Sequence, residues 1–431
     1  MHRVYIETYG CTLNQAESDI MHAMLQEKFE LVINEADADI IILNTCTVKG
    51  PTENKIIERI KKLVKEKRKF VIAGCLTVNQ KKLRNYAPNA PMLSPSAIRH
   101  ICEAVDAASI DSPAVYNSVS KHMTIDPKLA TVPISRIPVN DGCTSNCFFC
   151  QTKLARPVLR SYSPKTIVKW INESVCAGAR EMQLTSMDLG AYGLDIKTNL
   201  ISLLNAIIED NSSTKTGHEF YVRLGMINPN HAKRILHELL EVLKHPKFYK
   251  FLHIPVQTGS EKVCKEMNRD HTVQDFVDIV EYARKQIPEI TIATDVIVGY
   301  PTETEDDFKQ TKVLLKQIKP DIINISKFSP RAGTKAKELK QLHNDTIKKR
   351  SREISLLVKD ILIEKRKALI GKKYAVLITE KQKDFTGRNM NYIQVVVKGF
   401  KGQLGEFINV EIIDANHGCL FGKIRDSNMW D

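Results

Sequence analysis

Three cysteines in one short segment constrain this chain more than any other feature of its sequence. Cys143, Cys147 and Cys150 form a CxxxCxxC pattern directly after a predicted strand, so that their thiolates can face one point. A structural zinc site closes with four ligands, usually as two pairs, and no fourth cysteine or histidine lies close by in the sequence. Three cysteines on a four-iron cluster leave one iron free to bind a small molecule. The segment therefore predicts an iron-sulfur cluster with one open iron.

A second set of three cysteines is scattered in sequence but regular in position, because each directly follows a predicted strand. These are Cys11, Cys46 and Cys75, after strands at residues 4–9, 39–45 and 70–74. In an open parallel sheet the carboxyl ends of the strands share one edge, where such folds bind ligands. The pattern predicts a second cluster with one open iron, although three buried core cysteines would give the same spacing.

The pattern of the 431 residues changes along the chain, which is too long for one ordinary core. Up to residue 105, apolar strands alternate with helical segments, as in a parallel-sheet α/β domain. Six further strand and helix units indicate an open, partial (β/α)6 barrel, short of the eight that close a full one. A basic helix over residues 335–369 then leads to a small antiparallel β-barrel. The predicted boundaries of this mixed α/β chain are 1–105, 106–131 (a linker), 132–365 and 366–431.

The charge of the chain is positive and uneven. The formal net charge is +13, and between Lys335 and Lys373 there are 13 Lys and Arg against 5 Asp and Glu. Such a surface attracts polyanions, most commonly nucleic acid, although a solvated basic surface is the simpler alternative. No apolar run approaches the roughly 18 residues of a membrane-spanning helix, and no signal peptide is evident. We therefore expect a cytoplasmic protein without membrane association, whose cysteines serve metal binding or catalysis.

Motifs along nearly the whole chain resemble those of a known enzyme family. The CxxxCxxC spacing resembles the signature of radical S-adenosylmethionine (SAM) enzymes, in which the amino and carboxylate groups of the cofactor chelate the open iron. Further motifs are similar to those of the methylthiotransferases, and the segment after residue 366 resembles their TRAM domain, a small RNA-binding barrel. These motifs lie at residues 9–18, 44–48, 73–75, 152–156, 160–162, 253–260, 267–269, 294–304 and 328–334.

The motif YGCTLNQAES around Cys11 is similar to that of the archaeal and eukaryotic branch of this family. That branch converts N6-threonylcarbamoyladenosine at position 37 of tRNA to its 2-methylthio derivative. Eukaryotic relatives can carry an apolar anchor after the last domain, so the resemblance implies a soluble, archaeal enzyme. Two positions depart from the pattern of the family, because Met187 stands where a Gln is usual and Pro157 stands where a Gly is usual.

The resemblance also implies roles for individual residues. The cluster on Cys143, Cys147 and Cys150 would reduce SAM to give a 5′-deoxyadenosyl radical. The cluster on Cys11, Cys46 and Cys75 would hold the sulfur that is transferred. The residues expected to bind SAM are Phe149, Ser186, Asp188, Arg223, Gln257, Val298 and Gly299.

Some of these roles have an alternative. Phe149 would pack on the adenine of SAM, although an aromatic residue there could equally fill the core. Arg223 would pair with the carboxylate of SAM, although an acidic neighbour is an equal alternative. Gly299 would let the adenine approach the backbone closely.

The expected partners are a tRNA substrate, SAM and an electron donor such as ferredoxin or flavodoxin, and the chain is expected to be a monomer. A two-cluster electron-transfer protein would explain the cysteines but not the barrel. A non-enzymatic RNA-binding scaffold would explain the basic segment but not two cysteine triads. Within the enzyme class, the alternatives are relatives that act on isopentenyladenosine in tRNA or on an aspartate of a ribosomal protein.

Overall fold

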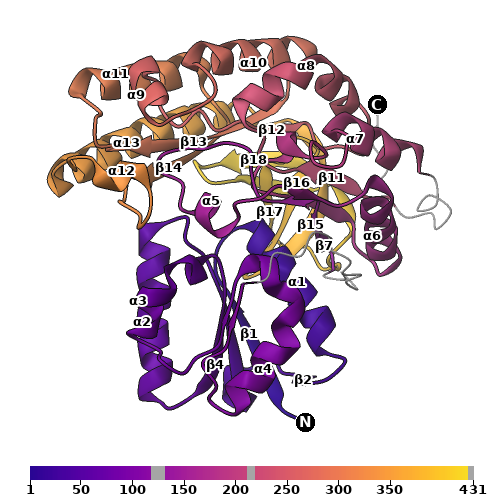
Figure 1. The fold of residues 1–431 in the computed structure, drawn as a ribbon. Helices are drawn as coiled ribbons and strands as arrows, with labels where there is room; N and C mark the ends of the chain where they lie inside the picture. The colour runs from indigo at the N-terminus through magenta and orange to yellow at the C-terminus, as the bar shows by residue number, and fades with distance from the viewer. Residues whose placement is uncertain (118–131, 211–218, 426–431) are drawn as a thin grey trace.

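Strands rich in Ile, Val and Leu build a 6-stranded parallel sheet in the N-terminal part of the computed structural model, which describes residues 1–117, 132–210 and 219–425 (Figure 1). The strand order is β2-β1-β3-β4-β5-β6, with helices packed on both faces. Because both faces are covered, the central strands β3 and β4 are almost entirely apolar and buried. The strands are β1 (Arg3–Thr8), β2 (Glu30–Leu31), β3 (Ile40–Thr45), β4 (Lys69–Gly74), β5 (Met92–Leu93) and β6 (Val115–Tyr116). The helices are α1 (Thr12–Leu25) and α4 (Ile101–Ser109) on one face, and α2 (Gly50–Lys65) and α3 (Gln80–Arg84) on the other.

The expected linker over residues 106–131 begins too early, because its first part belongs to the sheet domain. Helix α4 continues to Ser109, since Val105 and Ala108 pack against the strands. Strand β6 then pairs in parallel with β5. Residues 118–131 of the expected linker lie outside the described residues.

Six parallel strands form the central barrel as two sheets, β11-β10-β7 and β12-β13-β14, joined by single bridges such as Val222 to Phe248. The open, partial barrel is thereby confirmed. Its strands are β7 (Ile134–Pro138), β10 (Glu181–Thr185), β11 (Tyr221–Leu224), β12 (Phe251–His253), β13 (Thr291–Val298) and β14 (Ile322–Lys327), and a small hairpin pairs β8 (Asn140–Asp141) with β9 (Arg160–Ser161). Its helices are α5 (Thr152–Ala155), α6 (Pro164–Cys176), α7 (Leu200–Glu209), α8 (Pro229–Leu243), α9 (Glu261–Glu266), α10 (Val273–Gln286) and α11 (Glu305–Ile318).

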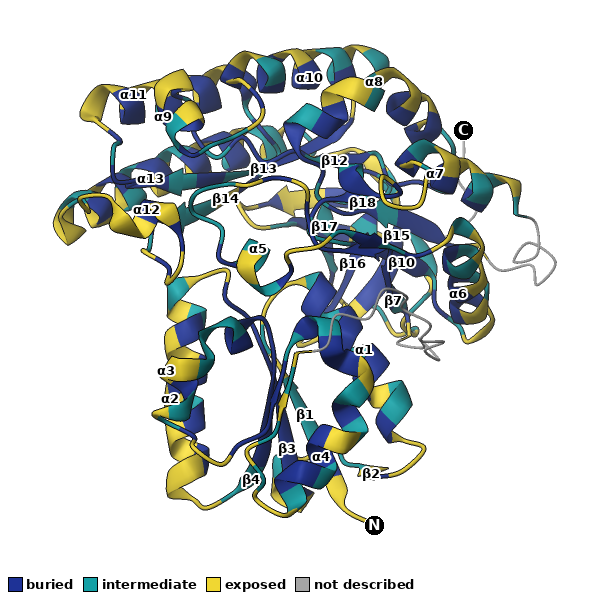
Figure 2. Ribbon diagram, in the orientation of Figure 1, coloured by how far each residue is buried: buried dark blue, intermediate teal, exposed yellow. Residues whose placement is uncertain are grey.

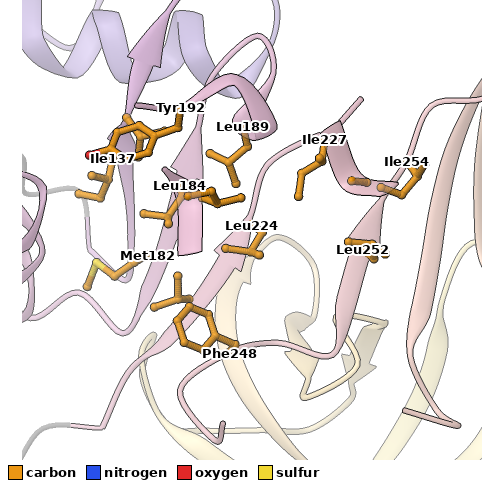
Figure 3. Packing of buried hydrophobic residues seen from close by; sticks show 14 of the residues in the cluster. Ile137, Met182, Leu184, Leu189, Tyr192, Leu224, Ile227, Phe248, Leu252 and Ile254 are labelled. Atoms are coloured by element: carbon orange, nitrogen blue, oxygen red, sulfur yellow. The ribbon is translucent and has the colours of Figure 1, made fainter. Parts of the chain in front are cut away.

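The main core lies between the barrel strands and the helices outside them. Side chains of neighbouring strands, among them Ile137, Leu184, Leu224 and Leu252, lie in one apolar layer (Figure 3). Figure 2 shows that the strands are buried and that the outer faces of the helices are exposed. The inner face of the barrel is left for polar side chains.

The expected basic helix over residues 335–369 consists of two helices, α12 (Lys335–Glu338) and α13 (Asn344–Lys367). Helix α13 is amphipathic and packs against β14 and α11 through Ile347, Ile354 and Val358, among others. Among the described helices, none combines the length and the apolar content that crossing a membrane requires.

The C-terminal part is a closed barrel in the order β15-β16-β17-β19-β18. All neighbouring strands are antiparallel except β17 and β19, which are parallel. The expected small β-barrel is therefore confirmed, with one parallel pair. Its strands are β15 (Lys373–Lys381), β16 (Phe385–Asn389), β17 (Gln394–Val397), β18 (Phe407–Ala415) and β19 (Leu420–Ile424).

The turn between β16 and β17 reaches into the amino end of the central barrel. Tyr392 donates from its hydroxyl to Glu181 at 3.2 Å and accepts from Gln183 Nε2 at 3.1 Å. Its ring packs on those of Tyr249 and Phe251, each with a centroid distance of 4.9 Å. Tyr392 has a φ of +60°, which costs energy in a non-glycine residue, so these contacts hold a strained turn in place. The C-terminal barrel therefore forms the floor of the central barrel.

We expect Tyr392→Ala to lower the free energy of unfolding of the central barrel by about 3 kcal/mol, because a packed aromatic ring and its hydrogen bonds are lost. Tyr392→Phe keeps the ring and should lose only about 1 kcal/mol. Denaturant titrations followed by the fluorescence of Trp170, which lies in the barrel core, measure both effects. A Trp170 transition that Tyr392→Ala leaves unchanged would contradict the role of this turn as the floor.

Candidate functional site

Three neighbouring parallel strands bring the first cysteine triad to one edge of the N-terminal sheet. Cys11, Cys46 and Cys75 follow the carboxyl ends of β1, β3 and β4. The chain is tightly packed at this edge, because a side chain on Gly10, with a φ of +110°, would come within 2.8 Å of Cys46 Sγ. The structure thus places the triad as the strand pattern predicted, and its use as a set of cluster ligands stays a prediction.

Two N–H groups point at sulfurs of the first triad. Val48 N donates to Cys46 Sγ at 3.4 Å, and Arg156 Nε donates to Cys75 Sγ at 3.3 Å. Burial raises the pKa of Cys75 to about 12 and also raises that of Cys46, although the charge of Arg156 opposes the effect at both thiols. Cysteines bind metals as thiolates, so a metal at this edge would displace their protons.

The second triad lies in the loop after β8, which other parts of the barrel hold in place. Phe148 N donates to Met267 O at 3.0 Å, and Phe148 O accepts from Ala336 N at 3.0 Å. Asn268 Nδ2 donates to Asn146 O at 2.8 Å. The residues on both sides of Cys147 are thereby fixed by the end of α9 and by α12.

Hydrogen bonds also reach the sulfurs of the second triad. Ser145 N donates to Cys143 Sγ at 3.4 Å, and Arg269 Nη1 donates to Cys147 Sγ at 3.1 Å. Burial raises the pKa of Cys143 to about 11 and raises that of Cys150. Cys143 is buried, whereas Cys147 and Cys150 are partly exposed.

The donor chemistry of both triads fits iron-sulfur clusters better than a single metal ion. Within residues 1–117, 132–210 and 219–425, no three Cys, His, Asp or Glu side chains converge closely enough to hold one ion. A four-iron cluster takes each cysteine on a different iron, and hydrogen bonds to its sulfurs tune its potential. Each triad offers three sulfurs with N–H donors to two of them. Each therefore fits a cluster with one open iron.

The two triads are joined by a direct contact between the residues that follow their cysteines. Thr47, after Cys46, donates a short hydrogen bond to Gln151, which follows Cys150. Gln151 Nε2 also donates to Asn79 Oδ1 at 3.2 Å. A further hydrogen bond of 3.0 Å joins the threonine hydroxyls at the start of α1 and the end of β10. The edge of the N-terminal sheet therefore faces the carboxyl ends of the barrel strands.

Arg156 completes this junction from the end of α5. Its guanidinium donates to both carboxylate oxygens of Glu17 on α1, at 2.5 and 2.7 Å, and to Asp141 Oδ1 at 2.6 Å. All three side chains are buried. One buried cation thus forms ion pairs with a carboxylate from each side of the junction while it donates to Cys75.

Ser186 and Asp188, both expected to bind SAM, follow β10. Asp188 is fully buried, and its Oδ1 accepts from Asn228 N at 3.1 Å while its Oδ2 lies 2.9 Å from His231 Nδ1. The carboxylate is therefore occupied by protein groups. Ser186 Oγ is buried and has no hydrogen-bond partner among the described residues, so it remains available to a ligand.

Arg223 lies on β11, whereas Gln257 lies beyond the end of β12 and is joined to Val296 of β13 by an isolated bridge. The guanidinium of Arg223 stacks over Phe251, 5.0 Å from the ring centroid, and over Tyr392 at 5.6 Å. In the part of the chain that the structure describes, no carboxylate pairs with Arg223, so the alternative of an acidic neighbour is not realised there. Gln257 has a φ of +71°, and its backbone N donates to Asp295 O at 2.8 Å. Such strain in a non-glycine residue is common at functional sites.

The apolar SAM candidates surround one end of β13. Val298 is buried, and Phe149 packs against the same small cluster as Ile297. The close approach of the adenine expected at Gly299 stays a prediction. A side chain there would meet Ile347 of α13 at 2.6 Å. This glycine is required by helix packing and by its φ of +80°.

Several residues of the site escaped the sequence analysis. Asp295 faces the barrel interior with His253 Nε2 at 2.9 Å and Asn324 Nδ2 at 2.8 Å. Burial acts to raise the pKa of Asp295, but these hydrogen bonds hold it below its usual value. The sequence patterns also predicted no role for Arg156 or Arg269, although both lie in motifs that are similar to those of the family. The only sequence feature that could have indicated a role for these two arginines is that each ends one of the motifs.

Comparisons with protein families match three parts of the chain. The model described as Uncharacterized protein family UPF0004 matches residues 3–93, that of the Radical SAM superfamily matches residues 137–315, and that of the TRAM domain matches residues 367–424. The three matches correspond to the N-terminal sheet, most of the central barrel and the C-terminal barrel.

Similar proteins extend over the whole chain. A protein of Archaeoglobus fulgidus named "Probable threonylcarbamoyladenosine tRNA methylthiotransferase" is 42% identical, covering 98% of each chain. A protein of Pyrococcus horikoshii with the same name is 37% identical, covering 98% of this chain and 100% of its own. The threonylcarbamoyladenosine tRNA methylthiotransferase of Drosophila melanogaster is 33% identical, covering 98% of this chain and 78% of its own.

Among solved structures, the radical S-adenosylmethionine methyltransferase TsrM of Kitasatospora setae, with cobalamin and a [4Fe-4S] cluster bound, has a TM-score of 0.56 and 13% identity. The match covers 78% of this chain and 73% of that one. At this identity the likeness concerns the fold alone.

We expect about eight iron and eight sulfide per chain after anaerobic reconstitution, because each triad can hold one four-iron cluster. Replacing the second triad by alanine should halve both values, and so should replacing the first. Iron and sulfide assays with absorption spectra measure the outcome. Loss of all iron when one triad is removed, or no loss at all, would contradict two independent cluster sites.

Proposed function

The chain belongs to the family of threonylcarbamoyladenosine tRNA methylthiotransferases, and we propose that it adds a methylthio group to carbon 2 of N6-threonylcarbamoyladenosine at position 37 of tRNA. The observation that carries this proposal is the contact between Thr47 and Gln151, which follow Cys46 and Cys150 of the two triads. A reaction that combines a sulfur source with a radical source requires the two to be close. An RNA-binding scaffold has no need of either triad, and an electron-transfer protein has no need of the barrel.

The residues of the chain hold, orient and shield the reacting groups. When bound, the clusters and SAM supply the sulfur and the radical that removes an unreactive hydrogen. Arg269 and the backbone of the loop orient the second triad, and the buried junction around Arg156 keeps water from Cys75, whereas Cys11 of the first triad is exposed. The cysteines that would hold the clusters are Cys11, Cys46 and Cys75 in one domain and Cys143, Cys147 and Cys150 in the other.

The SAM site is assigned to the carboxyl ends of the barrel strands beside the second triad, where active sites of such barrels gather. The free hydroxyl of Ser186 would donate or accept a hydrogen bond, and Phe149 and Val298 would offer apolar surface. Asp188 would act indirectly, by orienting the backbone of Asn228. The full set of residues predicted to bind SAM is Phe149, Ser186, Asp188, Arg223, Gln257, Val298 and Gly299. Of these, Arg223 stacks on Phe251 and Tyr392 at the amino end of the barrel, away from the carboxyl ends of the strands.

The tRNA surface that we assign is the lysine-phenylalanine face of the C-terminal barrel, formed by Lys381, Phe385, Lys398, Phe400 and Phe421. Lys381 Nζ lies 4.8 Å from the ring centroid of Phe385, and Lys398 Nζ lies 5.5 Å from that of Phe421. Both lysines are exposed. Cations beside aromatic rings suit phosphates and unstacked bases.

Helix α13 contributes less to RNA binding than its charge suggests. Arg350 is buried in an ion pair with Glu303 at 2.6 Å, and Lys365 pairs with Asp321. Exposed cations remain at Lys349, Arg352 and Lys359, among others. We therefore assign the helix a supporting role.

The remaining partners are proposed on more general grounds. An electron donor such as ferredoxin or flavodoxin would reach the second triad through the partly exposed Cys147 and Cys150. We propose that the chain acts as a monomer. The proposed place of action is the cytoplasm, where tRNA is modified.

Single cysteine variants separate the two proposed roles. Cys11→Ala should still cleave SAM to 5′-deoxyadenosine, because the second triad is intact, but should yield no methylthio nucleoside. Cys147→Ala should do neither. Chromatography of SAM products and mass spectrometry of tRNA digests measure both results. Methylthio product from Cys11→Ala would show that the first triad is not the sulfur site.

The nucleoside is tested with three tRNA substrates that differ only at position 37. Product should form on N6-threonylcarbamoyladenosine and should be absent with unmodified adenosine and with isopentenyladenosine. Equal product on isopentenyladenosine would refute the assigned substrate while leaving the chemistry intact. Modification of a ribosomal-protein aspartate, assayed with the same enzyme, would show that the substrate is a protein and not a tRNA nucleoside.

Removing the two lysines of the lysine-phenylalanine face should weaken tRNA binding and its dependence on salt. For Lys381→Ala with Lys398→Ala, the slope of log affinity against log salt should fall by roughly 1 to 2, because each lost phosphate contact removes about 0.7–0.9. The control is Lys55→Ala with Lys81→Ala, which removes the same charge from exposed positions of the N-terminal domain. Equal slopes for the two double variants would refute this face. Deleting the C-terminal barrel is a poorer test, since it also removes Tyr392 from the floor of the central barrel.

A further inference from the structure

Arg156 is a residue of the central barrel that touches the first cysteine triad. It follows α5, which Figure 1 shows between the N-terminal sheet and the barrel. Its side chain is 1% exposed, and its Nε lies 3.3 Å from Cys75 Sγ. The barrel thus supplies part of the surroundings of a triad that belongs to another domain.

The direction of this N–H group is fixed by the rest of the guanidinium. The two terminal nitrogens are occupied by both oxygens of Glu17 and by Asp141. Because a guanidinium is planar, anchoring its terminal nitrogens also aims Nε. A lysine in this place would present one donor without a fixed direction.

We propose that Arg156 is a positioning residue that raises the reduction potential of the cluster on the first triad by donating to the sulfur of Cys75. An N–H donor to a cluster sulfur stabilises the reduced, more negative state of the cluster, so it shifts the potential upward. The first cluster therefore has its working potential only when the N-terminal sheet is docked on the barrel. This inference rests on the proposed function only in that both triads carry clusters.

The second triad offers a matched comparison inside the same chain. Arg269 Nη1 donates to Cys147 Sγ at 3.1 Å, and Arg269 Nη2 is held by Asn228 and by Pro255 O. Each triad thus has one arginine aimed at one sulfur. Because the two arginines serve different triads, their effects on the two clusters should be separable.

The test is a redox titration, monitored by electron paramagnetic resonance, of reconstituted full-length protein whose second triad is replaced by alanine. Arg156→Gln should move the potential of the remaining first cluster to a more negative value. The ratio of reduced to oxidised cluster at a fixed potential should fall at least tenfold, which is 59 mV for a one-electron couple. Glu17→Gln removes an ion-pair partner but keeps the Nε donor, and should move the potential much less.

The reciprocal background, with the first triad replaced by alanine, provides the second control. There Arg269→Gln should lower the potential of the second cluster, and Arg156→Gln should leave it unchanged. An Arg156→Gln protein that holds its first cluster at an unchanged potential would overturn the proposal. A shift from Glu17→Gln of equal size and opposite sign would also overturn it, because it would assign the effect to charge at the junction. Equal shifts of both clusters by Arg156→Gln would do the same.

Arg156→Gln could fail to assemble the cluster, since it leaves buried carboxylates unpaired. Protein with the native Arg156, labelled with 15N arginine, then decides the question. Pulsed spectra of the reduced first cluster should show a nitrogen coupling, and its absence would refute the hydrogen bond. Absence of iron from both native triads would instead contradict the proposed function, so the two failures can be distinguished.

Discussion

Burying an arginine costs several kcal/mol unless its charge is compensated, and this constraint decides how the N-terminal sheet meets the barrel. Arg156 finds that compensation in Glu17 on one side of the junction and Asp141 on the other. Breaking such a set by removing one member costs about 3–5 kcal/mol, because a charge is left without a partner. The observed docking geometry satisfies all three groups. In that geometry the residues after Cys46 and Cys150 touch, and the two triads face one junction.

The sequence could predict the triads because local rules place them. Parallel strands end at a common edge, so Cys11, Cys46 and Cys75 came together once β1, β3 and β4 were recognised, and the family resemblance supplied the cofactors. Such rules could not predict the ion-pair partners of Arg156, since Glu17 lies 139 residues away and no sequence periodicity links the two residues. Gly299 shows the same limit, because its neighbour is Ile347 of α13, the fourth element after β13. Sequence patterns place residues on elements, but contacts between distant elements depend on how the whole chain packs.

The C-terminal barrel is both an RNA-binding candidate and a structural part of the enzyme core. Tyr392 closes the amino end of the central barrel, and its ring lies beside the guanidinium of Arg223, which we assign to the SAM site. The C-terminal barrel is therefore connected to the interior of the central barrel through the packed turn that holds Tyr392. The lysine-phenylalanine face and the proposed SAM site lie on two domains that pack against each other. The position of bound RNA relative to the cofactor therefore depends on this packing.

The floor made by Tyr392 also has a consequence for synthesis on the ribosome. Domains generally fold from the N-terminus as the chain emerges, so the N-terminal sheet can form before Arg156 has been made. The central barrel follows, but Tyr221, Tyr249 and Phe251 face an open end until β16 and β17 arrive. During that interval a nascent chain presents an aromatic-lined opening, and surfaces of this kind promote aggregation or recruit chaperones. The yield of folded protein in a cell should therefore depend on how quickly translation passes from residue 251 to residue 392.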